Sequence, residues 1–271
     1  MTRPLIFCLL LAAVAGCQRE TPAPQPGTPA AAATSTAAPA VPAVPLKDVI
    51  ENDPRYVIGI SYPPAASKYP GLAAELQRYA SAARADLMEA VEGTGDGKPT
   101  APYDLSLSFN TLVDTPKIVA IAADGSSYTG GAHGNPLVAR FVWLPEQGKL
   151  LKNTDLIGDA ASWRDISDYV REQLHAALSQ RIDADDLPPA ERADIIRSAG
   201  RMIDEGSQPQ ADAFDQFEPV VGADGKITAL RFVFPPYQVG PYADGTQSVD
   251  VPANVLLPHV APAYRGLFAG G

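Results

Sequence analysis

The sequence predicts an α+β fold of largely antiparallel sheets with three main helices packed on them, in one domain or two small lobes. Strand patterns come first, helical patterns interrupt them and strand patterns return, which differs from the regular alternation of a parallel α/β fold. The dipeptide Asp-Gly recurs between strand-like runs, and tight hairpins prefer it because their central residues need positive φ. These dipeptides are Asp124-Gly125, Asp224-Gly225 and Asp244-Gly245.

The first half of the domain predicts a strand, a helix and two further strands. Residues 56–62 are rich in β-branched and aromatic side chains, which indicates a strand. Over residues 71–92 apolar side chains recur in steps of three and four, as on one face of a helix. Residues 103–114 alternate apolar and polar side chains like a half-buried strand, and residues 118–123 predict the next one.

Two helices separate these strands from the last ones. An apolar stripe from Trp163 to Leu178 follows Ser162, a residue type that caps helix N-termini. Pro188-Pro189 begins a second helix, because proline suits the first helical position. Strand-like runs then surround the second and third Asp-Gly pairs, at residues 217–221, 227–234, 237–242 and 246–251.

The N-terminus predicts an exported lipoprotein. Residues 1–16 carry one early positive charge and then an apolar run, the order of a secretory signal. The run is shorter than the ~20 apolar residues that span a bilayer, and its end, Val14-Ala15-Gly16-Cys17, resembles a lipobox. We expect cleavage before Cys17 and lipid on its thiol; an ordinary signal peptide with a chance cysteine is the alternative. Gln18 favours the periplasmic leaflet of the outer membrane in a Gram-negative host.

Composition divides the rest of the chain. Residues 17–45 predict the lipidated cysteine and a disordered tether, since the segment is nearly all Ala, Pro, Thr, Gln and Ser. We divide the remaining residues into an N-terminal α+β lobe, residues 46–120, and a C-terminal domain, residues 121–271. The other of the two cysteines, Cys8, lies in the predicted signal. The folded part must therefore depend on its core and not on disulfides.

The chain is acidic, with a formal net charge of -10 at pH 7. This charge disfavours electrostatic binding to nucleic acid or to anionic lipid, and it favours a cationic partner if charge has a role in recognition. Solubility alone is the other explanation. We therefore expect membrane association through the lipid anchor only.

Motifs for catalysis, metals and cofactors are missing. Around Ser127 the fifth position of a Gly-x-Ser-x-Gly elbow is Thr129. Residues 93–98 look like a phosphate loop, but Glu92 and Pro99 stand where the motif needs Gly and Ser or Thr. Three histidines and no free cysteine in the mature chain leave few zinc ligands. The sequence thus predicts no enzyme, metal site or cofactor.

Two segments concentrate candidate contact residues. Residues 128–135 hold three glycines in five positions, which allow backbone geometries closed to other residues. Residues 234–245 carry two tyrosines on a proline-stiffened loop, and such rings bury much area while losing few torsions. A glycine bend and packing at a sheet edge are the structural alternatives. The candidate partner-binding residues are Tyr128, Thr129, Gly130, Gly131, His133, Asn135, Pro235, Tyr237, Pro241 and Tyr242.

These two segments resemble a known domain family. Tyr-Thr-Gly-Gly-Ala-His-Gly-Asn at 128–135, followed by a strand and a long helix, resembles the extracellular domain of the lysozyme-sensing anti-sigma factor RsiV. Tyr-x-x-x-Pro-Tyr-Ala-x-Gly at 237–245 is similar to the other hallmark of that family. Its members include a non-catalytic domain of the peptidoglycan deacetylase PdaC. The resemblance is specific over residues 125–260, and residues 50–120 are only similar to the companion domain upstream.

The resemblance implies binding at the cell envelope. The best-understood member binds lysozyme, a strongly basic wall hydrolase, and an acidic domain suits that partner. We expect a binding module that recognises a lysozyme-like or other peptidoglycan-acting hydrolase, as inhibitor, immunity factor or sensor. The alternatives are direct binding of peptidoglycan or another wall saccharide, and an enzyme that uses His133 as general base near Asp124.

Overall fold

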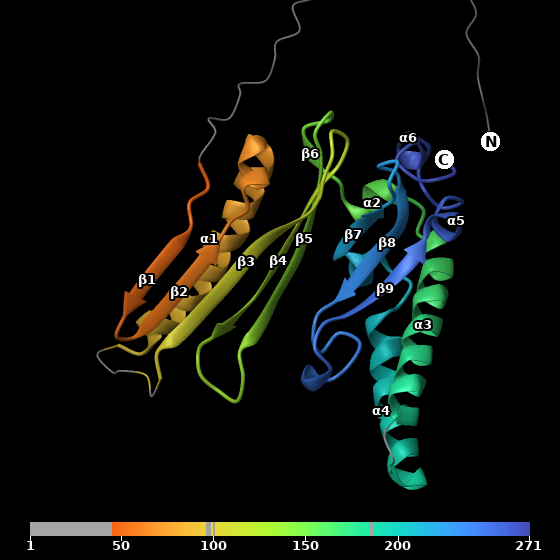
Figure 1. Ribbon diagram of the computed structural model, residues 1–271. Coiled ribbons are helices and arrows are strands. Elements are labelled where there is room, and N and C mark those ends of the chain that lie inside the picture. Colours follow the sequence, from red (N-terminus) through yellow and green to blue (C-terminus); the bar gives the residue numbers. More distant parts are fainter. Residues whose placement is uncertain (1–44, 96–98, 100, 185–186) are drawn as a thin grey trace, which may run out of the picture. The chain divides into compact units, whose positions relative to one another are not determined.

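The computed structural model describes residues 45–95, 99, 101–184 and 187–271 (Figure 1). It contains a six-stranded sheet, a three-stranded antiparallel sheet and three long helices, which confirms the predicted α+β class. No helix among the described residues is both long and apolar enough to cross a bilayer. The predicted signal peptide, Cys17 and nearly all of the predicted tether lie outside the described residues.

The six-stranded sheet has its strands in sequence order. All neighbours pair antiparallel except β2 and β3, which are parallel because helix α1 (Pro70–Gly93) connects them. The strands are β1 (Val49–Asp53), β2 (Tyr56–Ser61), β3 (Tyr103–Asp114), β4 (Val119–Tyr128), β5 (Asn135–Leu144) and β6 (Lys149–Leu150). Strands β4 and β5, which we assigned to the C-terminal domain, lie in this sheet. The edge strand β1 was missed, because its sequence VIEND has a weak strand pattern.

Helix α1 covers one face of this sheet. Its buried residues recur every three or four positions, as predicted, and include Leu72, Leu76 and Leu87. They pack on the alternating inward residues of the strands, such as Leu107 and Ile121, and form one core cluster. The residues of β3 between the inward ones are mostly exposed, so the half-buried pattern expected for residues 103–114 is confirmed.

The three-stranded sheet packs beside two long helices (Figure 1). Its order is β7-β8-β9, and α3 contacts both β9 and α4. The elements are β7 (Phe217–Val221), β8 (Ile227–Phe234), β9 (Gln247–Pro252), α3 (Ser162–Ala184) and α4 (Pro189–Gly206). Short turns of helix complete this part: α2 (Asn153–Leu156), η2 (Ala211–Phe214), η3 (Tyr242–Asp244), α5 (Ala253–Leu256) and α6 (Pro262–Arg265). A short helix η1 (Pro64–Lys68) precedes α1.

Aromatic side chains fill the core of this second part. Trp163 stacks on Phe214 with ring centroids 5.4 Å apart, and Phe232 meets Phe214 edge-on. The same cluster includes Val113 and Val142 from the six-stranded sheet. Strands β3 to β5 therefore present one face to α1, and the end of the other face to the second core. Apolar packing joins the two sheets at that end.

The first predicted hairpin is wrong. Strand β4 continues through Asp124 and Gly125 and pairs on both sides, with β3 and with β5. A Cβ on Gly125 would lie 2.0 Å from the carbonyl oxygen of Ser106, so here glycine permits a close approach of two strands. The glycine at this position serves packing and not a turn.

The other two Asp-Gly pairs behave differently from each other. Gly225, with φ 74°, turns the chain between β7 and β8, and this hairpin is confirmed. Gly245, with φ 67°, comes shortly before β9. The run 237–242 before it is no strand, because it folds into a loop that ends in η3. That loop, residues 235–246, becomes the β8–β9 loop of the candidate site.

Candidate functional site

The two segments that the sequence marked out meet in space. The His133 ring, from the turn between β4 and β5, stacks on Tyr242 with centroids 4.0 Å apart and planes 14° from parallel. Its Nε2 lies 2.8 Å from the hydroxyl oxygen of Tyr237. The rings of Tyr237 and Tyr242 are 5.7 Å apart. We call His133, Tyr237 and Tyr242 the aromatic cluster.

The neighbours of His133 decide how its ring hydrogen-bonds. Nδ1 lies 3.1 Å from the carbonyl oxygen of Gly134, which can only accept a hydrogen bond. In the neutral imidazole we therefore assign the proton to Nδ1, and Nε2 accepts from the hydroxyl of Tyr237. Both nitrogens have partners, and the ring is held with one edge against the turn and one face against Tyr242.

Tyr237 has an unusual backbone conformation. Its φ is 75°, and among the described residues it is the only non-glycine residue with positive φ. Its N–H donates to the carbonyl oxygen of Gly240 at 3.0 Å, which closes the loop around it. The residue stays 53% exposed. Such a conformation costs on the order of 1–3 kcal/mol, and it persists only where the surroundings enforce it.

The β8–β9 loop is anchored from several sides. The side-chain amide of Gln238 donates to the carbonyl oxygens of Gly206 and Ala213, at 2.9 and 2.8 Å. A Cβ on Gly206 would lie 1.8 Å from the carbonyl oxygen of Gln238, so the loop rests directly on the end of α4. Asp244 is bound by Arg181 of α3 at 2.8 Å. These contacts enforce the conformation of Tyr237.

The β4–β5 turn is held more lightly. The hydroxyl of Tyr128, at the end of β4, donates to the carbonyl oxygen of Gly131 at 3.2 Å. Gly130 and Gly131 have φ values of 103° and 99°, which explains why this turn needs glycine. Thr129 follows Tyr128 in the turn.

The remaining predicted contact residues flank the cluster. Asn135 is exposed and is the first residue of β5. Pro235 is half-buried directly after β8, and its carbonyl oxygen accepts the N–H of Gln238. Pro241 is exposed and precedes η3. The structure thus places all ten predicted residues in or beside two loops that touch.

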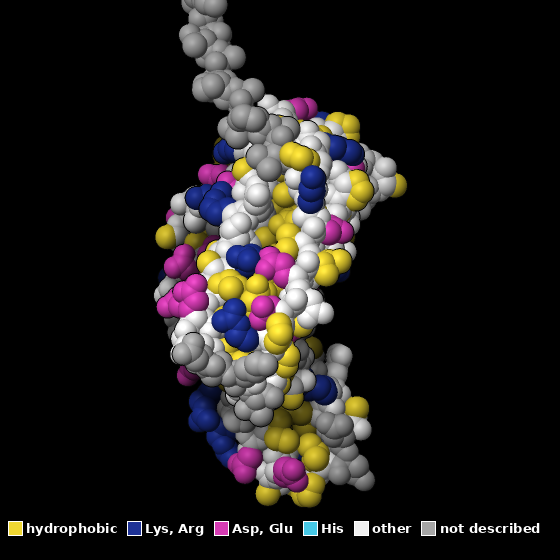
Figure 2. All heavy atoms as spheres, turned by 90° about the vertical axis from the view of Figure 1, so that its left-hand side faces the viewer, with side chains coloured by type: hydrophobic (Ala, Val, Ile, Leu, Met, Phe, Trp, Pro, Cys, Tyr) yellow, Lys and Arg dark blue, Asp and Glu magenta, His cyan; other side chains and the backbone are white. Residues whose placement is uncertain are grey.

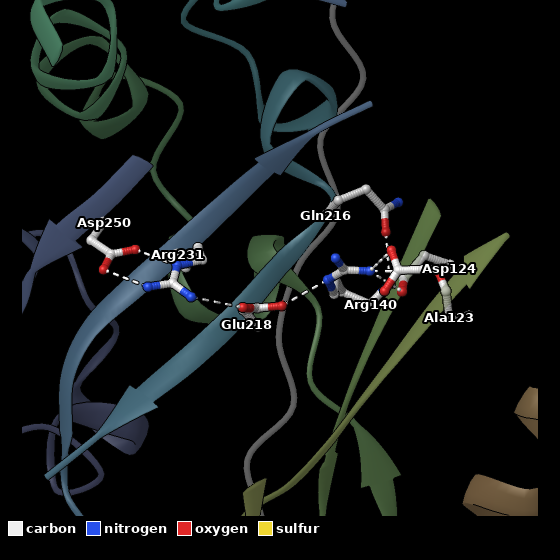
Figure 3. A network of polar contacts seen from close by, with 8 residues as sticks. Ala123, Asp124, Arg140, Gln216, Glu218, Arg231 and Asp250 are labelled. Carbon is white, nitrogen blue, oxygen red and sulfur yellow. Dashed lines mark hydrogen bonds and ion pairs between the residues drawn. The ribbon is translucent and has the colours of Figure 1, made fainter. Parts of the chain in front are cut away.

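A chain of ion pairs, which the sequence did not suggest, runs across both sheets (Figure 3). Arg140 of β5 binds Asp124 of β4 at 2.9 Å and Glu218 of β7 at 2.7 Å. Glu218 also lies 3.5 Å from Arg231 of β8, which binds Asp250 of β9 through two contacts of 2.6 and 2.9 Å. We call these five residues the charge ladder. The alternation of side chains along each strand could have predicted which of these residues share a face of their own sheet. No sequence signal predicts that β5 lies beside β7.

The middle of the charge ladder is its most buried part. The side chains of Arg140 and Glu218 are 9% and 12% exposed, against 41–47% for Arg231, Asp250 and Asp124. The backbone N–H of Arg140 also donates to the side-chain oxygen of Gln216 at 2.8 Å. Hydrogen bonding to Asp250 raises the pKa of Arg231 above its ordinary value. The guanidinium of Arg231 therefore stays charged at every physiological pH.

The same contacts bear on the enzyme alternative. A general base His133 would need an orienting carboxylate, and Asp124 was the candidate. Asp124 instead binds Arg140, while His133 binds Tyr237 and the backbone of its own turn. Among the described residues, no carboxylate hydrogen-bonds to His133, so the pair expected for this alternative is not formed.

Comparisons with known proteins agree with the resemblance in both segments. The model of the family described as deacetylase PdaC matches residues 50–136, and that of a protein family of unknown function, DUF3298, matches residues 154–254. No curated protein matches the chain. His133 lies in the first matched region, and both tyrosines of the aromatic cluster lie in the second.

Solved structures of DUF3298 proteins have the same fold. A family member from Bacteroides fragilis superposes with a TM-score of 0.51 at 15% identity, covering 83% of this chain and 97% of that chain. A DUF3298 family protein from Pseudomonas aeruginosa PAO1 gives 0.50 at 16% identity, covering 84% and 99%. At these identities the likeness concerns the fold alone. Together with the two family matches, this likeness supports an RsiV- and PdaC-like domain organisation, in which a PdaC-type region is followed by a DUF3298-type region.

Proposed function

We propose that the protein is a non-catalytic binding module of the cell envelope whose aromatic cluster contacts a lysozyme-like or other peptidoglycan-acting hydrolase. In this proposal lipid on Cys17 anchors the protein in the periplasm. The family matches are compatible with a binding module. The partner and the anchor rest on the motifs at 128–135 and 237–245, on the lipobox and on the acidic charge.

The observation that carries the proposal is Tyr237. Its large ring stays half-exposed in a costly backbone conformation, and a glycine there would avoid the backbone cost. The loop is anchored so that the ring is displayed in one orientation, and preorganised aromatic residues of this kind dominate many interfaces. We infer that Tyr237 is the central contact residue.

Electrostatics supports a basic partner. The net charge of -10 attracts a cationic protein over distances of about a Debye length, ~8 Å at physiological salt. One face of the molecule shows no separate acidic patch among its described residues (Figure 2). On the face around β1, basic and acidic side chains are interspersed among hydrophobic ones (Figure 2). Charge therefore speeds the encounter, and the aromatic cluster provides the specificity.

The test is calorimetric titration of residues 18–271 with hen lysozyme and a panel of wall hydrolases at physiological salt. We expect saturable one-to-one binding. Tyr237→Ala and Tyr242→Ala should each weaken it by ~2 kcal/mol, about 30-fold, because hot-spot tyrosines contribute that much. Purified peptidoglycan, titrated in parallel, tests the saccharide alternative.

Ile50→Ala is the matched control. Ile50 is 87% exposed on the edge strand β1, which β2 and β3 separate from β4, and its loss should leave affinity unchanged. Absence of binding across the panel would overturn the hydrolase proposal. Binding that survives both tyrosine substitutions would place the contact surface elsewhere.

A further inference from the structure

The aromatic cluster is assembled from two different sheets. His133 follows β4 of the six-stranded sheet, while Tyr237 and Tyr242 follow β8 of the three-stranded sheet. One hydrogen bond, one ring stack and one tilted ring contact join them directly. The hydrogen bond is exposed to solvent, and contacts of these kinds are individually weak. They are too weak to hold two sheets in register.

A stronger link between the two sheets joins β5 to β7. Arg140 is on β5, the strand that leaves the His133 turn, and Glu218 is on β7, the neighbour of β8. Their ion pair at 2.7 Å is largely buried. The bond from the N–H of Arg140 to Gln216 ties the same two edges. Charge-assisted hydrogen bonds are directional, so this link defines a geometry and not only a proximity.

The remaining members of the charge ladder fix that link from both sides. Asp124, on β4, holds the guanidinium of Arg140 within the first sheet. Arg231, on β8, holds Glu218 within the second. The guanidinium of Arg140 and the carboxylate of Glu218 are thus each held by a partner in their own sheet as well as by one another, as Figure 3 shows. The pair therefore transmits the position of one sheet to the other.

We propose that Arg140 and Glu218 are positioning residues, which set the register of the two sheets so that His133 meets Tyr237 and Tyr242. Apolar packing at the far end of β3 to β5 holds the sheets together. It is non-directional and would tolerate small shifts. A buried ion pair adds little net stability, because desolvating the two charges offsets their attraction. Its role in this proposal is to favour one arrangement of the two sheets over others.

The first readout needs no partner. In residues 18–271 with labelled histidine, the nitrogen chemical shifts of the neutral form of the His133 ring should show a single tautomer, with the proton on Nδ1. In Arg140→Met/Glu218→Met, which replaces the pair by apolar chains of similar length, we expect a mixture of tautomers. The midpoint of chemical unfolding should stay near that of the parent. An unchanged tautomer in this variant would overturn the proposal.

A milder variant covers the case in which the double variant does not fold. Glu218→Gln keeps the shape of the side chain and removes one charge of the pair, so the tautomer should shift in the same direction by less. The matched control is Arg84→Met/Glu51→Met. It removes another Arg–Glu pair, between α1 and β1, with two bonds of 2.9 Å, that touches neither loop. This control should leave His133 as it is.

The second readout rests on the proposed function. If hen lysozyme binds the parent protein, its affinity should fall at least tenfold in the double variant and stay unchanged in the control. If lysozyme binds no form of the protein, the proposed function fails, while the tautomer measurement still decides the role of Arg140 and Glu218. Full affinity and an unchanged tautomer together in the folded double variant would show that the pair has no positioning role.

Discussion

The β8–β9 loop and the β4–β5 turn form one surface, yet they are held in different ways. The loop is fixed by Gln238 to the end of α4 and to η2, and by Asp244 to α3. The turn has two exposed side-chain bonds of its own, from Tyr128 to Gly131 and from His133 to Gly134. The loop imposes positive φ on a tyrosine, whereas the turn reaches positive φ only with glycines.

This difference teaches where the rigidity of the surface comes from. A loop with several anchors can hold a bulky residue in a costly conformation, because the anchors offset the strain. A turn without anchors adopts positive φ only where glycine makes it inexpensive. We infer that the loop orders His133, through Tyr237 and Tyr242, and that the turn follows. Damage to the loop should therefore disturb the whole surface.

The largest effect is expected from Gly206→Ala, which changes the residue of α4 on which the β8–β9 loop packs. The new Cβ would lie 1.8 Å from the carbonyl oxygen and 2.6 Å from the carbonyl carbon of Gln238. Both the helix and the loop meet here through their backbones, so neither can give way by turning a side chain. We expect the free energy of unfolding to fall by about 2–3 kcal/mol, as for other overpacked sites, measured by chemical denaturation. Gly93→Ala is the control, since Gly93 also ends a helix and a Cβ there meets nothing within 4 Å. Equal effects in both would refute the anchoring role of Gly206.

The second effect concerns the strain at Tyr237. Alanine keeps the Cβ that makes φ 75° costly, while glycine removes it. We therefore expect Tyr237→Gly to be more stable than Tyr237→Ala by about 1 kcal/mol, the reverse of the usual order of these two residues. Chemical denaturation of the two variants measures the difference. The usual order, with alanine the more stable, would mean that the loop relaxes and that its anchors do not enforce the conformation.

The same contrast explains what the sequence could predict. The strands over 103–114, 217–221 and 227–234 and the long helices were predicted well, because periodic burial and proline or glycine boundaries are local signals. Asp124-Gly125 was misread because the dipeptide looks the same in a turn and inside a strand. Only the close approach of Ser106, on the neighbouring strand β3, tells the two apart, and that contact is set by the sheet.

The candidate site was predictable in its residues but not in its construction. Glycines beside His133 and tyrosines between prolines are visible in the sequence, and the structure joins them. The anchors of the loop and the charge ladder were not visible. Gln238, Gly206, Arg140 and Glu218 are ordinary residue types in ordinary positions, and their roles depend on which elements the fold places side by side.

The smallest effect is expected in the turn itself. Gly131→Ala places a Cβ at φ 99°, which in a rigid backbone would cost on the order of 1–3 kcal/mol. The added atom meets nothing within 4 Å, and the turn has few bonds to lose, so it can relax. We expect a loss below about 1 kcal/mol in chemical denaturation, less than the rigid-backbone cost.

Gly148→Ala is the comparison for this turn, because Gly148 has φ 61° in the tight β5–β6 turn and its N–H donates to the carbonyl oxygen of Leu144 at 2.8 Å. A Cβ there also meets nothing within 4 Å, so the two variants differ in how firmly the backbone is held and not in crowding. The Gly148 variant should lose more, about 1–2 kcal/mol. If Gly131→Ala lost as much, the β4–β5 turn would be as rigid as the β5–β6 turn, and His133 would be ordered without help from the tyrosines.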